Sequence, residues 1–123
     1  MRVCIPTESA SLEAPVDPRL GRAGCFVIID THSQEIVGVI PNEQDLQAAS
    51  GAGVQAAELI ADSGAEAVVC ANVGPRAFRA LRSAGIQVYV GAAGTAAEAV
   101  GAFRNGQLLP ADGPNVAGGG PEQ

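Results

Sequence analysis

The segment Ser50-Gly51-Ala52-Gly53-Val54-Gln55 is a glycine-rich turn directly before a run of apolar and helix-forming residues. Glycine lets the backbone turn tightly and approach other groups closely. A turn that opens a helix presents backbone N–H groups at the positive end of the helix dipole, where anions bind favourably. The segment therefore predicts the start of a helix and a candidate position for an anion.

Helix and strand patterns alternate on the C-terminal side of this turn. Gly64 and Gly85 follow helical stretches as C-terminal caps, and Pro75 stands at a first helical position. Thr95 and Glu98 have the spacing of a capping box. The predicted helices cover residues 53–63, 77–84 and 95 to about 106, and the predicted strands cover residues 67–71 and 88–90.

Three short apolar runs on the N-terminal side predict strands over residues 3–5, 26–29 and 36–40, the last two joined by a hairpin turn. The resulting order, β-β-β-α-β-α-β-α, predicts an α/β fold in which one mixed five-stranded sheet lies between helical layers. We expect one domain over residues 1–109. Residues 110–123, rich in Gly and Pro, are expected to form a flexible C-terminal tail.

Two further loops, Arg19-Leu20-Gly21-Arg22 and Asn72-Val73-Gly74-Pro75-Arg76, are predicted to lie beside the turn at 50–55. Ligands of open α/β sheets bind outside the carboxyl ends of the parallel strands, and the first and fourth strands lead into these loops. Taken singly, each loop is also compatible with a purely structural turn. The predicted ligand-binding residues are Arg19, Leu20, Gly21, Arg22, Ser50, Gly51, Ala52, Gly53, Asn72, Val73, Gly74 and Arg76.

Composition limits the classes of ligand and partner. The chain has 123 residues and a net charge of −6, which argues against nucleic acid or an anionic membrane as partner. All seven basic residues are Arg, a composition that suits the binding of oxyanions and sulfide-rich anions but also follows from a GC-rich genome. The turn at 50–55 has neither the Lys nor the spacing of a P-loop, so nucleotide binding is not indicated.

The three cysteines have no C-x-x-C spacing, and no apolar run approaches the roughly 20 residues that span a bilayer, so we expect a reduced cytoplasmic protein. Cys4 and Cys70 lie in apolar strands and are predicted to be small core residues. Cys25, close in sequence to Arg22, is the alternative ligand or redox thiol. The strands at 3–5 and 67–71 carry no carboxylate, which excludes a two-metal nuclease, and we expect no catalytic residue.

Several segments together are typical of one family. They are Arg2-Val3-Cys4-Ile5-Pro6-Thr7, Pro18-Arg19-Leu20-Gly21-Arg22-Ala23 with Phe26, Gly51-Ala52-Gly53-Val54-Gln55-Ala56-Ala57, Gly74-Pro75-Arg76-Ala77-Phe78 with Leu81, and Ala84-Gly85-Ile86-Gln87-Val88-Tyr89. Over about residues 1–108 the chain resembles the dinitrogenase iron–molybdenum cofactor biosynthesis domain family. The resemblance implies a ribonuclease-H-like three-layer fold and a carrier of metal–sulfur clusters.

The resemblance implies an anionic, molybdenum-containing cluster as the ligand, either a molybdenum–copper sulfide or an iron–molybdenum–sulfur cluster, and a possible protein partner for its delivery. Many members of the family have His where this chain has Arg19 and Ser50. We therefore expect no protein–metal bond and a cluster held non-covalently by Arg and backbone N–H groups. His32 is predicted to be a solvated turn residue at the opposite edge. The alternative function is a small-molecule enzyme or a sensor of a phosphate ligand that uses the same pocket.

Overall fold

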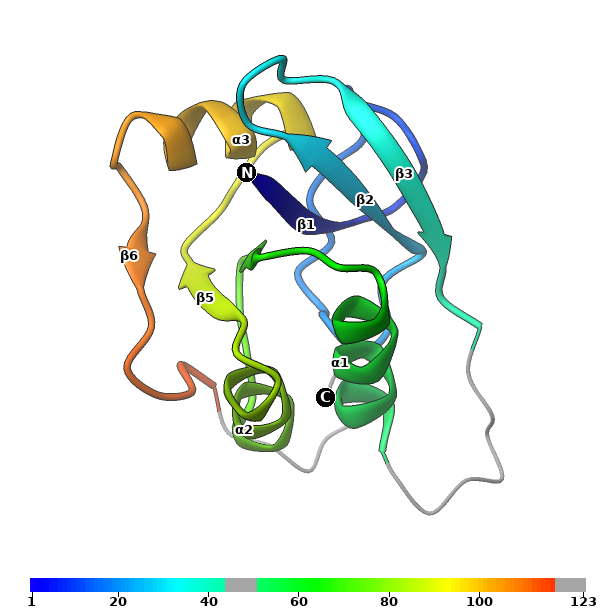
Figure 1. The fold of residues 1–123 in the computed structure, drawn as a ribbon, viewed down its shortest axis with the longest axis vertical. Helices are drawn as coiled ribbons and strands as arrows, with labels where there is room; N and C mark the ends of the chain where they lie inside the picture. Colours follow the sequence, from blue (N-terminus) through cyan, green and yellow to red (C-terminus); the bar gives the residue numbers. More distant parts are fainter. Residues whose placement is uncertain (44–50, 117–123) are drawn as a thin grey trace.

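The computed structural model describes residues 1–43 and 51–116 of the chain. These residues form a mixed sheet with helices on both faces, which confirms the predicted α/β class (Figure 1). The elements are β1 (Arg2–Thr7), β2 (Cys25–Asp30), β3 (Ile36–Pro41), α1 (Ala52–Asp62), β4 (Ala67–Val69), α2 (Pro75–Ser83), β5 (Gln87–Val90), α3 (Ala96–Arg104) and β6 (Leu109–Pro110).

The strand order in the sheet is β3-β2-β1-β4-β5-β6. Strands β1, β4 and β5 are parallel, with Val3 opposite Ala67 and Val68 opposite Val88. Strands β2 and β3 form the predicted antiparallel hairpin on one side of β1. The three parallel strands therefore send their carboxyl ends to one edge of the sheet, which is the edge where ligands bind in folds of this type.

The sequence predicts five strands, whereas the sheet has six. The additional strand is β6, in which Leu109 and Pro110 pair with Val90 and Tyr89 of β5. The backbone N–H of Ala111 then donates to the carbonyl of Val88 at 2.8 Å. The free edge of β5 provides backbone partners that a local reading of a Gly- and Pro-rich segment does not reveal. Pro110 and Ala111, at the start of the predicted tail, are thus paired with the sheet, and residues 117–123 lie outside the described part.

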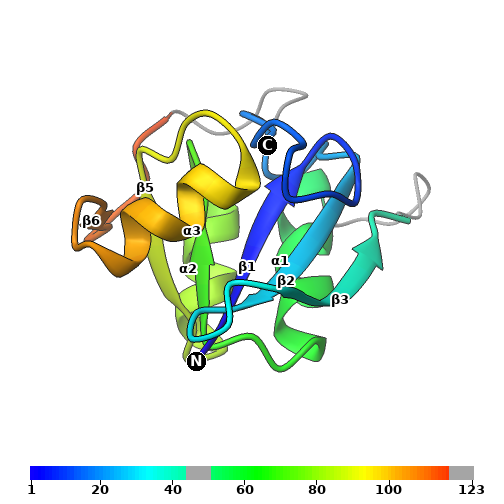
Figure 2. The ribbon, with the colours of Figure 1, turned by 90° about the horizontal axis from the view of Figure 1, so that it is seen from above.

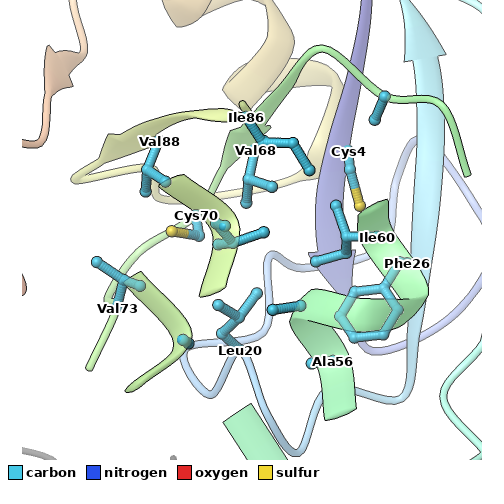
Figure 3. Close-up of a cluster of buried hydrophobic side chains, with 14 of the residues drawn as sticks. Cys4, Leu20, Phe26, Ala56, Ile60, Val68, Cys70, Val73, Ile86 and Val88 are labelled. Atoms are coloured by element: carbon cyan, nitrogen blue, oxygen red, sulfur yellow. The ribbon is translucent and has the colours of Figure 1, made fainter. Parts of the chain in front are cut away.

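The core has one hydrophobic cluster on each face of the sheet, because successive strand residues point to opposite faces. Cys4, Phe26 and Val68 pack beneath α1 and α2 in the first cluster (Figure 3). Ile5 and Val27 pack beneath α3 in the second cluster. Figure 2 shows the sheet between these layers, with α3 on one side and α1 and α2 on the other. Ala, Val, Ile and Leu supply most of the packing, each large side chain contributing about 1.5–3 kcal/mol on burial.

The helix ends follow the local signals of the sequence. Gly64 and Gly85 have φ angles of +80° and +79°, the left-handed conformation that ends a helix at little cost for glycine. Pro75 is at the start of α2. Thr95 accepts a hydrogen bond from the N–H of Glu98 while Glu98 accepts one from the N–H of Thr95, which confirms the capping box. None of the helices in the described ranges is long and apolar enough to cross a membrane.

Candidate anion-binding site

The segments at the carboxyl edge of β1, β4 and β5 form two separate groups. On the side of α3, the N–H of Val16 donates to the carbonyl of Gly94 at 2.9 Å. The N–H groups of Ala96 and Ala97, in the first turn of α3, donate to carbonyls of the β1–β2 connection. With the capping box in addition, the N-terminus of α3 is satisfied by the protein itself and is a poor place for a ligand.

On the side of α1 and α2, the β1–β2 connection lies directly against the start of α1. A Cβ atom on Gly21 would be 2.8 Å from the backbone N of Gly53 and 2.9 Å from the carbonyl C of Ala52. Both distances are shorter than a real Cβ contact, so this approach requires glycine at position 21. Asn42, beyond the end of β3, donates from Nδ2 to the carbonyls of Gly21 and Ala23 at 3.1 and 2.8 Å and supports the loop from the other side. The predicted contact between these two loops is therefore present.

The third predicted loop reaches the same place through Arg76. If Gly51 carried a Cβ atom, that atom would lie 3.9 Å from Nη1 of Arg76. The guanidinium group therefore lies beside the N-cap of α1. Arg76 is itself in the first turn of α2, whose N-cap is Gly74. Two helix N-termini and one guanidinium group thus meet on one side of the sheet.

Among the described residues, the N-termini of α1 and α2 and the Arg76 guanidinium group contribute positive charge to this side. The N-caps of α1 and α2 are both glycines in extended conformation, which provide no side chain to accept from first-turn N–H groups. Neither helix has an acidic residue in its first turn, whereas α3 has Glu98 there. Since the positive ends of two helix dipoles add to the Arg76 charge, the arrangement favours an anion.

Asn72 connects the loops but its side chain is already engaged. Its Nδ2 donates to the carbonyl of Pro18 at 3.3 Å, and its Oδ1 is 3.4 Å from Nδ2 of Asn115. Asn115 also accepts from the N–H of Val73 at 2.6 Å. Asn72 therefore connects its own loop to the β1–β2 connection by a hydrogen bond to Pro18. The Val73 N–H is already bonded to Asn115.

The side chains of Leu20 and Val73, two of the predicted ligand-binding residues, are not exposed to a ligand. Both side chains are buried in the hydrophobic cluster beneath α1 and α2 (Figure 3). The reason is that each residue lies where its loop crosses the end of the core, so its side chain fills space between the helices and the sheet. These residues support the loops from below and leave only backbone atoms for a ligand.

The remaining predicted arginines, Arg19 and Arg22, lie on the β1–β2 connection. Arg19 is half exposed, and its Nε is 3.4 Å from Oδ1 of the buried Asp17, which partly neutralises its charge. Arg22 is exposed on the same loop, and its N–H donates to the carbonyl of Arg19. Ser50 lies outside the described residues.

The cysteines are buried and free. Burial raises the pKa of the Cys4 thiol far above its usual value and raises that of Cys70 to about 12, so both thiols are protonated at neutral pH. Cys25 is 8% exposed, with its Sγ 3.4 Å from Oγ1 of Thr7, and is not the exposed thiol that the ligand alternative requires. Buried thiols of this kind are poor ligands for a cargo that enters from solvent.

His32 lies in the β2–β3 turn at the opposite edge of the sheet. Its N–H donates to Oδ1 of Asp30 at 2.8 Å, and the neighbouring Thr31 binds the carbonyl of Met1. Hydrogen bonds from Ser33 and His32 lower the pKa of Asp30, as in an ordinary turn. Within residues 1–43 and 51–116, no group of three or more His, Cys, Asp and Glu side chains is placed to hold a metal ion.

Two residues that support the candidate site are missing from the set predicted by sequence. Asn42 holds the loop at 21–23, and Asn115 holds the loop at 71–73. Each stands in a segment without helix or strand periodicity, so no pattern distinguishes it from a surface asparagine. Only its long-range hydrogen bonds reveal its role.

The sequence and the fold of this chain agree with one protein family. The family described as dinitrogenase iron-molybdenum cofactor matches residues 1–106, and the chain belongs to it. Membership associates the chain with the binding or carriage of a cofactor and with a metal–sulfur cluster as the class of ligand.

Individual relatives support the assignment. The chain is 38% identical to the orange protein from Desulfovibrio gigas, solved in its apo form, with a TM-score of 0.86 over 94% of this chain and 96% of that chain. It is 35% identical to a Thermotoga protein described as a NifB protein, with a TM-score of 0.72 over 89% and 91% of the two chains. An uncharacterized protein from Methanocaldococcus jannaschii is 29% identical over 110 residues, which are 88% of this chain and 89% of that protein.

Proposed function

We propose that the protein is a non-catalytic carrier of an anionic metal–sulfur cluster, held without covalent bonds between the N-termini of α1 and α2. The observation that carries the proposal is the position of the Arg76 guanidinium group beside Gly51, where two helices begin without acidic residues. A guanidinium group and backbone N–H groups in one place form a donor set for a multivalent anion.

The chemistry of such a cargo fits the donors present. Sulfide ligands of a cluster carry negative charge and accept several N–H hydrogen bonds at once, while the half-buried glycine at 51 permits close approach to the backbone. The buried thiols of Cys4 and Cys70 are protonated, so they offer no thiolate to the cluster. Binding by hydrogen bonds and charge leaves the cargo free to pass to a partner protein.

We propose a molybdenum-containing cluster, with a molybdenum–copper sulfide as the first choice and an iron–molybdenum–sulfur cluster as the second. Iron in clusters is commonly bound by Cys or His ligands. The described part of the site has neither at its surface, since Cys25 is buried and His32 is at the opposite edge. A tetrahedral molybdenum sulfide unit needs no protein ligand of that kind.

The experiment is the uptake of tetrathiomolybdate, with and without copper, by the purified full chain. After gel filtration, molybdenum, copper, iron and sulfur are measured against protein, and sulfide-to-metal charge-transfer bands are recorded. We expect retained molybdenum and visible absorption in the wild type and much weaker retention in Arg76→Ala. The matched control is Arg79→Ala, an exposed arginine one turn further along α2.

The same preparation separates the alternatives. Inorganic phosphate is titrated into the protein by calorimetry, and protein isolated from its natural source is analysed for molybdenum, copper and iron. Binding of phosphate with no retention of tetrathiomolybdate would favour a phosphate-ligand sensor or a small-molecule enzyme and would overturn the carrier proposal.

A further inference from the structure

Asn115 lies in the segment that follows β6 and makes hydrogen bonds with the loop between β4 and α2. No sequence pattern predicts these hydrogen bonds. Its backbone N–H donates to the carbonyl of Val73 at 3.0 Å, and its Oδ1 accepts from the N–H of Val73 at 2.6 Å. Its Nδ2 lies 3.3 Å from the carbonyl of Ala71 and 3.4 Å from Oδ1 of Asn72. One asparagine therefore binds both backbone polar groups of Val73, a residue with no exposed surface.

The contacts continue across Asn72 to the β1–β2 connection. Because Asn72 accepts from Asn115 through Oδ1, its Nδ2 is the group that donates to the carbonyl of Pro18. The two carboxamides form a directed chain from the C-terminal segment to the loop that carries Arg19 and Arg22. In each carboxamide the nitrogen donates and the oxygen accepts, so these partners determine which side-chain atom of Asn72 and of Asn115 is the nitrogen and which is the oxygen.

The bond to the Val73 carbonyl has a consequence for Gly74, the N-cap of α2. In a trans peptide the C=O of one residue and the N–H of the next point in opposite directions. The Val73 carbonyl points to Asn115, so the Gly74 N–H points away from the C-terminal segment. Figures 1 and 2 show this segment on the side of α2 that is opposite to α1.

We propose that Asn115 is a positioning residue of the anion site: it holds the Val73–Gly74 peptide at the start of α2, and through Asn72 it holds the loop at 18–22. This inference rests on the proposed function for the identity of the ligand, but the contacts that it describes exist in the protein without ligand. The segment after β6 is thereby a part of the site and not an appendage to the domain.

The test compares the full-length wild type with Asn115→Ala and, as a matched control, Asn105→Ala at the C-cap of α3. Amide hydrogen exchange is measured by NMR in the absence of any anion. In Asn115→Ala we expect exchange of the Val73 amide to rise about tenfold, as for the loss of one hydrogen bond to a buried group. Resonances of residues 18–22 should shift as well. Unchanged Val73 protection in Asn115→Ala would overturn the proposal.

Two more measurements complete the test. Asn115→Asp keeps an acceptor for the Val73 N–H but loses the donor to Ala71 and Asn72, so it should restore Val73 protection while residues 18–22 remain shifted. Tetrathiomolybdate should dissociate several-fold faster from Asn115→Ala than from the wild type and Asn105→Ala. Equal dissociation rates would overturn the positioning role. A wild type that binds no tetrathiomolybdate would instead overturn the proposed function, and the exchange data would still decide whether Asn115 holds the loop.

Discussion

The guanidinium group of Arg76 lies beside Gly51: its Nη1 atom is 3.9 Å from the place that a Cβ atom would occupy if residue 51 had a side chain. The two residues belong to different helices, and each stands at or next to the N-terminus of its own. Their contact joins the positive ends of α1 and α2 and adds a full charge to them. The predictions about binding follow from this arrangement.

Replacing Arg76 by Ala should reduce retention of tetrathiomolybdate by roughly tenfold or more, because a charge-assisted hydrogen bond contributes about 1.5–3 kcal/mol. Arg76→Lys should recover part of the loss, since it restores charge without the planar fork. Retention is measured as bound molybdenum after gel filtration. Arg79→Ala and His32→Ala serve as controls, and a loss in either control equal to that in Arg76→Ala would place the anion elsewhere.

Gly21→Ala should lower the free energy of unfolding by about 1–3 kcal/mol, the range for an overpacked side chain. The added methyl group would meet backbone atoms of Ala52 and Gly53, which cannot move without displacing the start of α1. Urea denaturation gives the measurement. Gly101→Ala, in the open surface of α3, is the control and should be neutral or stabilise by up to about 1 kcal/mol. A Gly21→Ala protein as stable as the wild type would show that the two loops are not in tight contact.

A variant in which Cys4, Cys25 and Cys70 are all replaced by Ala should still take up tetrathiomolybdate. The three thiols are buried, and those of Cys4 and Cys70 are held in the protonated form, so binding does not depend on a thiolate. Bound molybdenum is measured together with the circular dichroism spectrum, which reports whether the variant is folded. If a folded Cys25→Ala variant lost uptake, Cys25 would have to be a ligand.

The stability of the protein should fall as the pH rises above about 9. In the folded state burial raises the pKa of Cys4 and Cys70 above the ordinary thiol value of 9.0, so the unfolded chain loses these protons first. The folded state then binds more protons than the unfolded state, and the free energy of unfolding decreases with pH by roughly 1 kcal/mol per thiol at pH 10.

The chain has no Lys, which leaves few other groups to titrate in this range. Urea midpoints at pH 8 and pH 10 give the measurement. A variant with Ala at positions 4 and 70 should lose most of the dependence. The same alkaline loss in both proteins would contradict the assignment to the thiols.

The sequence alone determined the helices α1 to α3, the strands β1 to β5, their order and the edge at which their loops gather. These features depend on local signals: Gly64 and Gly85 end helices, Pro75 begins one, and Thr95 caps another. Interactions of this kind reach only a few residues along the chain, so a pattern of neighbouring residues is sufficient to predict them. The β-β-β-α-β-α-β-α order then implied the parallel strands and their common carboxyl edge.

Only the tertiary structure decided which groups at that edge meet. The bond between Asn115 and Val73 joins residues 42 positions apart, and the sixth strand exists because β5 has a free edge. Burial of Leu20 and Val73 depends on the space between the helices and the sheet, which no local pattern specifies. Such contacts arise when distant segments share one core, and their hydrogen bonds are selected by geometry in three dimensions. The positions of the groups that face the ligand are therefore determined by tertiary packing, whereas the order of helices and strands is determined by local sequence signals.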